Sequence, residues 1–171
     1  MIKLKNILKE SYVWERKFGE KLPTLADVRR KKLKEDLLIE ATRWNVAVEM
    51  PNGKVTAVYG HQDGDPIYVG KILKQYYSQG GKVRDLVKLG KNGISVLDKS
   101  MKGGKDHSFS NPQKGETVFY GRDRGEKNNM TSIYKNREDF GKNFGEEFGY
   151  VWSMKERRWY YYDHRGNEKT L

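Results

Sequence analysis

The chain contains no cysteine, which excludes disulfide bonds, thiolate metal ligands and a cysteine nucleophile. It also lacks any apolar run near the roughly 18 residues that a membrane-spanning helix requires. The first residues carry no hydrophobic segment of the kind found in a secretory signal peptide. We therefore expect a soluble, intracellular protein that has no membrane partner.

Apolar residues are scarce as well, at 36% of the chain, whereas aromatic residues reach 12% and include 11 tyrosines. Because each buried aromatic ring removes a large apolar area from water, a small number of rings can still build a core. A length of 171 residues is typical of one domain with an appended segment. These values predict a modest core inside a highly charged surface.

Positive charge exceeds negative charge, with 34 Lys and Arg against 23 Asp and Glu and a formal net charge of +11. One interpretation is a polyanionic partner, such as nucleic acid or an acidic protein. The other is a solvated surface that is rich in lysine, because the lysines are spread along the whole chain and form no single patch. Composition leaves both interpretations open.

Residues 42–90 form the most informative stretch of the chain. Two segments rich in β-forming residues, 43–50 and 54–61, flank a Pro-Asn-Gly sequence at 51–53. An Asn-Gly pair between apolar segments is the strongest short-range signal for a β-hairpin. We therefore expect the two segments to pair as antiparallel strands.

Two helices are predicted after this hairpin. The first, over 66–78, ends before a pair of glycines. Its apolar residues recur at helical spacing and are Val69, Ile72, Leu73, Tyr76 and Tyr77. The second helix is predicted over 82–89, with Gly90 as its C-cap. Because an amphipathic helix and a sheet each need an apolar partner, we expect them to share a core.

The second half of the chain predicts a strand over 116–120 and a helix over 137–147 that two glycines weaken. Aromatic segments at 148–153 and 158–163 predict a second hairpin. Together these patterns predict a compact α+β domain over 41–171, with a small antiparallel sheet and helices packed on one face.

The N-terminal part differs in composition from this domain. It is rich in Lys and Leu, contains a basic run at 29–32, and gives way to β-forming residues after Glu40. Its apolar residues follow partial helical spacing. We therefore expect an N-terminal helical extension over 1–40.

His61, Asp63 and Asp65 form a His-x-Asp-x-Asp group after the first hairpin. Histidine and carboxylate side chains close together in sequence occur in metal sites. The same group also suits an ordinary turn, because Asp65 before Pro66 is a typical helix start with Asp as the N-cap. We favour the turn, expect neither a metal nor a cofactor, and keep the three residues as binding candidates.

A second candidate is Arg122-Asp123-Arg124, which follows the strand predicted over 116–120. Two Arg side chains in such a loop can bind a phosphate or a carboxylate. The alternative is an Arg–Asp–Arg network of ion pairs that pins the loop. The neighbouring glycines match neither a P-loop nor a dinucleotide-binding motif. If the helix start at Asp65 lies near these arginines, the two loops form a site for a small anionic ligand.

No pair of residues predicts hydrolysis. His107 and Ser108 are only neighbours in sequence, where side chains rarely face each other, and there is no Gly-x-Ser-x-Gly motif. The sequence therefore favours a non-enzymatic protein that acts by binding. The alternatives are a nucleic-acid-binding protein and a small enzyme that acts on a metabolite or signalling molecule.

The nucleic-acid alternative depends on aromatic residues near Lys and Arg, which can stack on the bases of a single strand. The candidates for stacking are Tyr12, Trp14, Tyr76, Tyr77, Tyr160, Tyr161 and Tyr162. The competing explanation is that these rings fill a small core.

Five segments of the chain are informative together: VYGHQDG at 58–64, VGKILKQYY at 69–77, KVRDLVKLG at 82–90, HSF at 107–109 and TVFYGRDRGE at 117–126. In this order they resemble segments of small uncharacterised proteins of tailed bacteriophages. In those proteins a His-Trp-Asp-Gly turn precedes a similar helix, whereas this chain has Gln62 in place of the Trp. The resemblance, which extends to an aromatic C-terminal strand, implies a phage source and implies no activity.

Residues 1–10 also resemble the capsid-targeting leaders of large contractile-tailed phages. Such leaders end in Leu or Ile, any residue and then Glu, after which the prohead protease cuts. Leu-Lys-Glu at 8–10 has this pattern, and Leu-Ile-Glu at 38–40 repeats it at the predicted domain boundary. The resemblance implies processing at Glu10 or Glu40, and the alternative is an ordinary docked N-terminal helix.

The sequence thus predicts a phage accessory protein located either in the virion interior or in the host cytoplasm. Its expected partner is a host or phage macromolecule, with nucleic acid among the candidates, or a small anionic ligand. The candidate binding residues lie on two loops and are His61, Asp63, Asp65, Arg122, Asp123 and Arg124.

Overall fold

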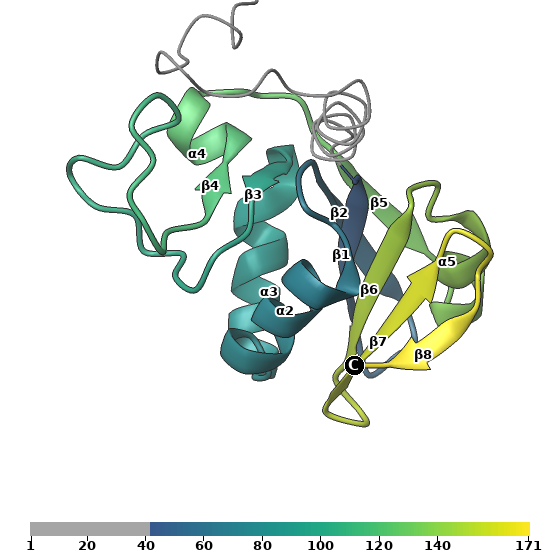
Figure 1. The fold of residues 1–171 in the computed structure, drawn as a ribbon. Helices are drawn as coiled ribbons and strands as arrows, with labels where there is room; N and C mark the ends of the chain where they lie inside the picture. Colours follow the sequence, from purple (N-terminus) through teal and green to yellow (C-terminus); the bar gives the residue numbers. More distant parts are fainter. Residues whose placement is uncertain (1–41) are drawn as a thin grey trace, which may run out of the picture. The chain divides into compact units, whose positions relative to one another are not determined.

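The computed structural model describes residues 42–171 (Figure 1). The helical extension predicted over 1–40 and the predicted processing positions Glu10 and Glu40 lie outside these residues. The described part contains an eight-stranded sheet and several short helices, which confirms the predicted α+β class. Within 42–171, no helix has the length and apolarity that are needed to cross a bilayer.

The first predicted hairpin is confirmed. Strand β1 (Trp44–Glu49) pairs antiparallel with β2 (Val55–Gly60) along the whole of both strands. The turn holds Gly53 at φ +82°, and the Gly53 N–H donates to the carbonyl of Met50 at 2.8 Å. Glycine adopts this left-handed conformation at no steric cost, so the Asn-Gly pair directs the chain back on itself.

The second predicted hairpin is also present. Strand β6 (Phe148–Ser153) pairs antiparallel with β7 (Arg158–Asp163). A short edge strand, β8 (Glu168–Thr170), then pairs with β7 in a tail for which the sequence predicts no strand. Its three residues are all exposed, so no apolar pattern marks β8 in the sequence.

The sheet is mixed, which corrects the expectation of a wholly antiparallel sheet. The strands follow the order β4-β3-β2-β1-β6-β7-β8, and β5 (Thr131–Tyr134) pairs with β2 off this path. Strand β1 is parallel to β6, and β2 is parallel to β3 (Ile94–Val96). Local periodicity identifies strand residues, but it carries no information on the direction in which distant strands pair.

The helices after the first hairpin lie close to their predicted positions. The first begins as a π-helical turn, η3 (Pro66–Gly70), and continues as α2 (Lys71–Tyr76). The second is α3 (Gly80–Leu89), with Gly90 as its C-cap, as the sequence predicts. A 3-10 turn, η4 (Gly90–Asn92), then leads into β3.

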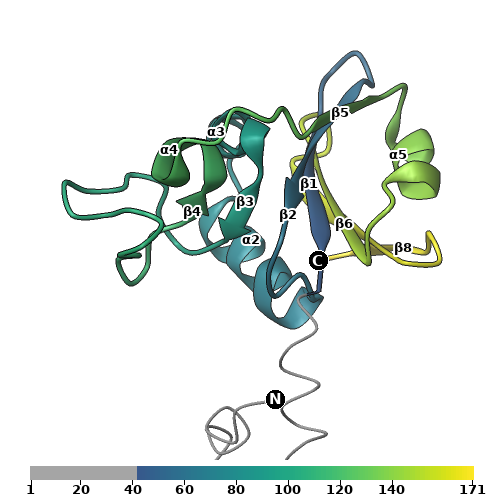
Figure 2. The same cartoon turned by 90° about the horizontal axis from the view of Figure 1, so that it is seen from above.

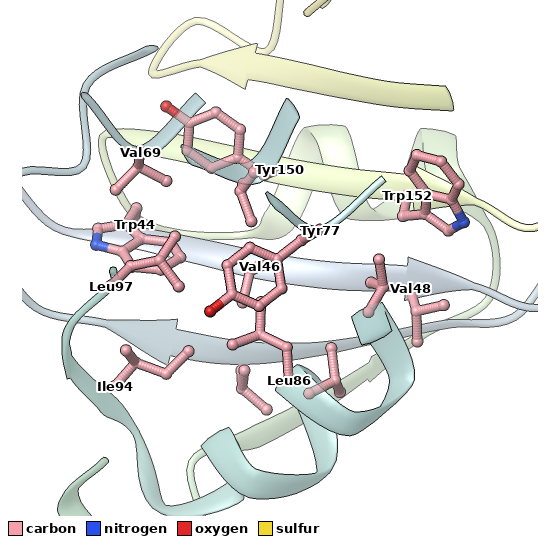
Figure 3. Close-up of a cluster of buried hydrophobic side chains, with 14 of the residues drawn as sticks. Trp44, Val46, Val48, Val69, Tyr77, Leu86, Ile94, Leu97, Tyr150 and Trp152 are labelled. Atoms are coloured by element: carbon pink, nitrogen blue, oxygen red, sulfur yellow. The ribbon is translucent and has the colours of Figure 1, made fainter. Parts of the chain in front are cut away.

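The larger hydrophobic core lies between one face of the sheet and helices α2 and α3 (Figure 3). From β1, Trp44, Val46 and Val48 point into it, because alternate residues of a strand share one face. The helices contribute Leu73 and Leu86, which are fully buried. The tyrosine-rich composition supplies much of the remaining volume.

Helices cover both faces of the sheet rather than the single face that the sequence predicts (Figure 2). On the second face, helix α5 (Arg137–Asn143) packs with Phe140 against Ala47 of β1. Gly149 of β6 also permits this contact, since a Cβ there would lie 2.8 Å from the Phe140 ring. Strand β1 is thus buried from both sides, as central strands between two layers are.

The segment around residue 120 differs most from its prediction. The predicted strand over 116–120 shortens to β4 (Val118–Phe119), and the predicted loop with Arg122-Asp123-Arg124 belongs to the helix α4 (Tyr120–Arg124). The Asp123 carboxylate accepts the Phe119 N–H at 2.7 Å and so stabilises the start of this helix.

Candidate functional site

A groove of about 630 Å³ lies beside the end of β2 and helix α4. Segments that are far apart in the sequence contribute its walls. Its lining includes Arg43, Tyr59, His61, Tyr120, Arg124 and Glu146. Since no local stretch contains these residues together, the groove exists only in the folded protein.

Tyr59 and His61 reach the groove from the same side of β2. They are two residues apart in extended chain, so their side chains point in one direction. The Tyr59 hydroxyl lies 2.8 Å from His61 Nδ1, and the His61 N–H donates to the carbonyl of Ile94 at 2.9 Å. Burial raises the pKa of Tyr59, and the hydrogen bond between its hydroxyl and Nδ1 orients the imidazole ring.

Helix α4 brings Tyr120 and Arg124 to the opposite wall. The helix lies very close to η4, because a Cβ on Gly121 would be only 2.5 Å from Oδ1 of Asn92. Only glycine permits this approach without a shift of the neighbouring side chain. The approach places the Tyr120 ring 6.4 Å from the His61 ring, measured between centroids.

Four rings follow one another and form what we call the aromatic strip: Tyr59, His61 and Tyr120, which line the groove, and Phe109, which lies next to Tyr120 outside the lining. Their successive centroids are 6.1, 6.4 and 5.9 Å apart. The first three rings are half-buried, and Phe109 is 36% exposed. The strip therefore presents aromatic surface to a ligand instead of filling a core.

The charges of the groove come in both signs. Arg124 pairs with Glu126, with Nη1 and Oε1 3.1 Å apart, and its guanidinium also lies 4.7 Å from the centre of the Phe109 ring. The Arg124 side chain is nevertheless 53% exposed. Arg43 and Glu146 line the same groove, so positive and negative groups are both within reach of a ligand.

The carboxyl group of Glu146, which lines the groove, has a raised pKa. Burial raises the pKa of its carboxyl group, and the neighbouring Glu147 raises the pKa further, while Arg43 acts in the opposite direction. Protonation of Glu146 therefore begins at a higher pH than for an exposed glutamate.

Arg122 and Asp123 form a structural network next to α4. Asp123 accepts hydrogen bonds from Arg122 Nε at 2.6 Å and from the Phe119 N–H, and His107 Nε2 lies 3.3 Å from its carboxylate. Arg122 also donates to the carbonyl of Thr117 at 2.7 Å. Burial alone raises the pKa of Asp123, but the hydrogen bonds from Arg122 and Phe119 outweigh it and lower the pKa below its ordinary value. These contacts give the Arg122–Asp123 half of the predicted Arg–Asp–Arg network, whereas Arg124 pairs with Glu126 instead.

Asp65 acts as a helix cap. Its Oδ1 accepts hydrogen bonds from the backbone N–H groups of Ile67 at 2.7 Å and Tyr68 at 3.1 Å. These bonds satisfy the first N–H groups of η3. Asp63 lies in the preceding turn with φ +54°. Between residues 42 and 171, no group of three His, Asp or Glu side chains is arranged to hold a metal ion.

The structure thus brings His61 and Arg124 together and places Asp63, Asp65, Arg122 and Asp123 outside the groove lining. The roles of all six as binding residues stay a prediction. Sequence reasoning missed Arg43, Tyr59 and Tyr120. The spacing of Tyr59 and His61 is a usable signal for a shared strand face, but no local pattern points to Arg43 or Tyr120.

Two further predictions have structural outcomes. His107 and Ser108 do not pair, because His107 Nδ1 accepts the N–H of Gln113 and the Ser108 hydroxyl lies 3.3 Å from that of Ser110. Among the predicted stacking residues, Tyr77, Tyr160 and Tyr162 are buried, so core packing explains these three.

Comparison with family models, curated proteins and solved structures finds no match to this chain.

Proposed function

We propose that this protein acts by binding, without catalysis, and that the groove is its binding site. The observation that carries the proposal is the meeting of His61, Tyr120 and Arg124 in one groove. Rings, hydrogen-bonding groups and charges converge there, as they do in ligand sites. A binding role needs no more than this arrangement.

The contacts of His61 support a binding role over hydrolysis. Its Nδ1 is hydrogen-bonded to the Tyr59 hydroxyl. Within the part of the chain that the structure describes, no hydrogen bond joins His61 to a Ser or Thr hydroxyl. Activation of a hydroxyl nucleophile requires such a hydrogen bond to a base.

The test is nuclear magnetic resonance with isotope-labelled protein and three probes of defined chemistry: inorganic phosphate, adenosine monophosphate and glutamate. We expect at least one probe to shift amide signals at 59–61, 120–124 and 129–132, and to be recovered unchanged. Arg124→Gln weakens this response, whereas Arg84→Gln, an equal change of charge on exposed α3 surface, leaves it intact. Shifts confined to other surfaces, no shifts at all, or conversion of a probe would contradict the proposal.

We further propose that the protein is a phage accessory protein that is packaged in the virion and processed at its N-terminus. Support comes from the sequence resemblance of about 46–126 and an aromatic C-terminal strand to phage proteins, and of 1–10 to capsid-targeting leaders. The test is the intact mass of the protein from purified virions. A species that begins at Ser11 or Ala41 is expected, and absence of the protein from virions would overturn packaging.

A further inference from the structure

The groove continues into a second depression, and this continuity indicates the shape of its ligand. The second depression has a volume of about 790 Å³ and shares Arg43, Phe144 and Glu146 with the groove. Its lining also includes Lys142 and Arg165. Compact small molecules are usually held in closed pockets that bury most of their surface. Two adjoining open depressions suit an extended polymer better.

The aromatic strip indicates the chemistry of that polymer. Its centroid spacings of 5.9 to 6.4 Å are much wider than the rise of about 3.4 Å between stacked bases of a duplex. The rings of Tyr120 and His61 are also inclined by 65° to each other. Bases that contact successive rings must therefore be unstacked from one another, which a single strand allows and a duplex does not.

The charge of the protein favours a polyanion. The chain has a formal net charge of +11 and a pI near 9.6. Along the joined depressions, the basic residues Arg43, Arg124, Lys142 and Arg165 outnumber the carboxylates of Glu126, Glu146 and Glu147. Arg124 reaches the phosphates of a bound strand without leaving Phe109, because its side chain is half-exposed above that ring.

The two carboxylates of the groove are compatible with this ligand. Glu126 pairs with Arg124, so a phosphate that binds Arg124 has to compete with this exposed ion pair. Glu146 offers an acceptor for the exocyclic amino groups of cytosine or adenine, a contact that proteins use on base edges. Base edges are accessible to such a side chain in a single strand whose bases are splayed apart.

We propose that the groove binds single-stranded nucleic acid, with bases against the aromatic strip and phosphates beside Arg43 and Arg124. This inference rests on the proposed binding function and adds the class of partner. A peptide is the competing extended ligand, and the net charge argues against it unless the peptide is acidic.

The experiment is fluorescence anisotropy of the full chain with oligo(dT) and oligo(U) of about 12 nucleotides, a length within known single-strand site sizes. A duplex of equal length and a poly-glutamate peptide serve as competitors. We expect both single strands to bind, and the duplex and the peptide to compete poorly. The logarithm of the affinity should fall linearly with the logarithm of salt concentration.

Four variants locate the bound strand. Phe109→Ala removes an exposed ring and Tyr120→Ala a half-buried one, and each is expected to weaken binding about tenfold, the usual loss for one base stack. Arg124→Gln is expected to reduce the salt slope by about 0.7, the value for one lost phosphate contact. Arg84→Gln, with the same change of net charge on α3, is expected to change neither quantity. Circular dichroism checks that Tyr120→Ala folds, and Phe109→Ala tests the strip if it does not.

Three results would overturn the inference. The first is no affinity for either oligonucleotide, and the second is equal affinity for duplex and single strand. The third is an equal loss in the Arg84 and Arg124 variants, which would indicate diffuse charge attraction. If the small probes still shift the groove signals in these cases, the binding function stands and only the class of partner is wrong. Strong competition by poly-glutamate would assign the groove to an acidic peptide.

Discussion

The indole ring of Trp44 occupies the space that a side chain on Gly60 would need. The two residues are opposite each other in the β1–β2 pair, and a Cβ on Gly60 would lie 2.1 Å from Cε2 of the ring. Trp44 is fully buried, and its Nε1 donates to the carbonyl of Gln62 at 2.9 Å. The turn that carries His61 to the groove is thus anchored on this ring.

Gly60→Ala tests this packing. The added methyl group has to displace a fully buried ring, and overpacking of this kind typically destabilises a protein by about 1–3 kcal/mol. Gly81→Ala is the matched control. A Cβ at this position meets nothing within 4 Å, and the residue lies in helix α3. We expect Gly81→Ala to stabilise the protein by about 0.5–1 kcal/mol. Urea unfolding measures both changes, and equal stability of the Gly60 variant and the wild type would refute the described packing.

Asp123→Asn tests the network beside α4. The variant keeps the shape of the side chain but loses the charge that Arg122 and the Phe119 N–H engage, so we expect a loss of about 1–3 kcal/mol at neutral pH. The folded pKa of Asp123 lies below the ordinary value of 3.8. Its stabilisation is therefore complete above that value and disappears as the pH falls through the folded pKa.

Unfolding free energies measured across the acidic range check this sign. The stabilities of the wild type and of Asp123→Asn should converge as the pH falls. Asp85→Asn, at an exposed position of α3, should follow the wild type throughout. A constant difference between the wild type and the Asp123 variant at every pH would show that the carboxylate charge has no part in the stabilisation.

Tyr77→Phe tests a buried hydroxyl. The Tyr77 hydroxyl donates to the carbonyl of Asp98 at 2.7 Å and lies 3.1 Å from Oγ1 of Thr117. Burial raises the pKa of Tyr77 to about 12 from an ordinary 10.0, so the folded protein keeps a proton that the unfolded chain releases. Stability is therefore lost as the pH rises above 10.0.

Two effects are expected in the Tyr77→Phe variant. At neutral pH it should lose about 1 kcal/mol with the hydrogen bonds of the hydroxyl. Between pH 10.0 and about 12 it should lose less additional stability than the wild type does. The measurement is urea unfolding across this pH range. The control is Tyr76→Phe, because the side chain of Tyr76 is only half-buried. An alkaline loss as steep in the variant as in the wild type would contradict the assignment.

Arg137→Ala tests the attachment of α5 to the strands. The guanidinium lies 3.1 Å from Glu156 and 3.6 Å from Glu168, and its centre is 4.0 Å from the centroid of the Tyr160 ring. Losing the ring contact and three ion pairs, the third of them to Glu49 at 3.9 Å, is expected to destabilise the protein by about 1–2 kcal/mol. Lys142→Ala on the same helix breaks only an exposed ion pair with Glu138 and should change stability little. Thermal unfolding of both variants is the measurement. Similar melting temperatures of the two variants would show that Arg137 does not attach α5 to the strands.

Several elements were predictable because their signals are local. The Asn-Gly turn specified the first hairpin, and the left-handed Gly53 is the physical cause. Asp65 before Pro66 indicated a capped helix start, which the N–H groups of Ile67 and Tyr68 complete. Each of these features depends on side chains and backbone groups within a few residues of one another.

The candidate site was predictable only in part. His61 and Arg124 were selected as reactive residue types on loops, and both line the groove. Arg122 and Asp123 were selected by the same reasoning, yet they are engaged in holding the Phe119 backbone and the loop. Residue type alone cannot separate these two roles, because the difference lies in the partners that folding supplies.

The amino-acid sequence alone determined the hairpins and the positions where helices start and end. Turn geometry and apolar spacing act between residues that are close together in the chain, so local sequence is sufficient for these elements. The parallel pairing of β1 with β6, the helices on both faces and the groove required tertiary structure. Parallel and antiparallel neighbours bury the same alternating face of a strand, so local periodicity is equally compatible with both. Only the packing of distant segments selects one pairing, and that selection brings Arg43, His61 and Tyr120 to a common surface.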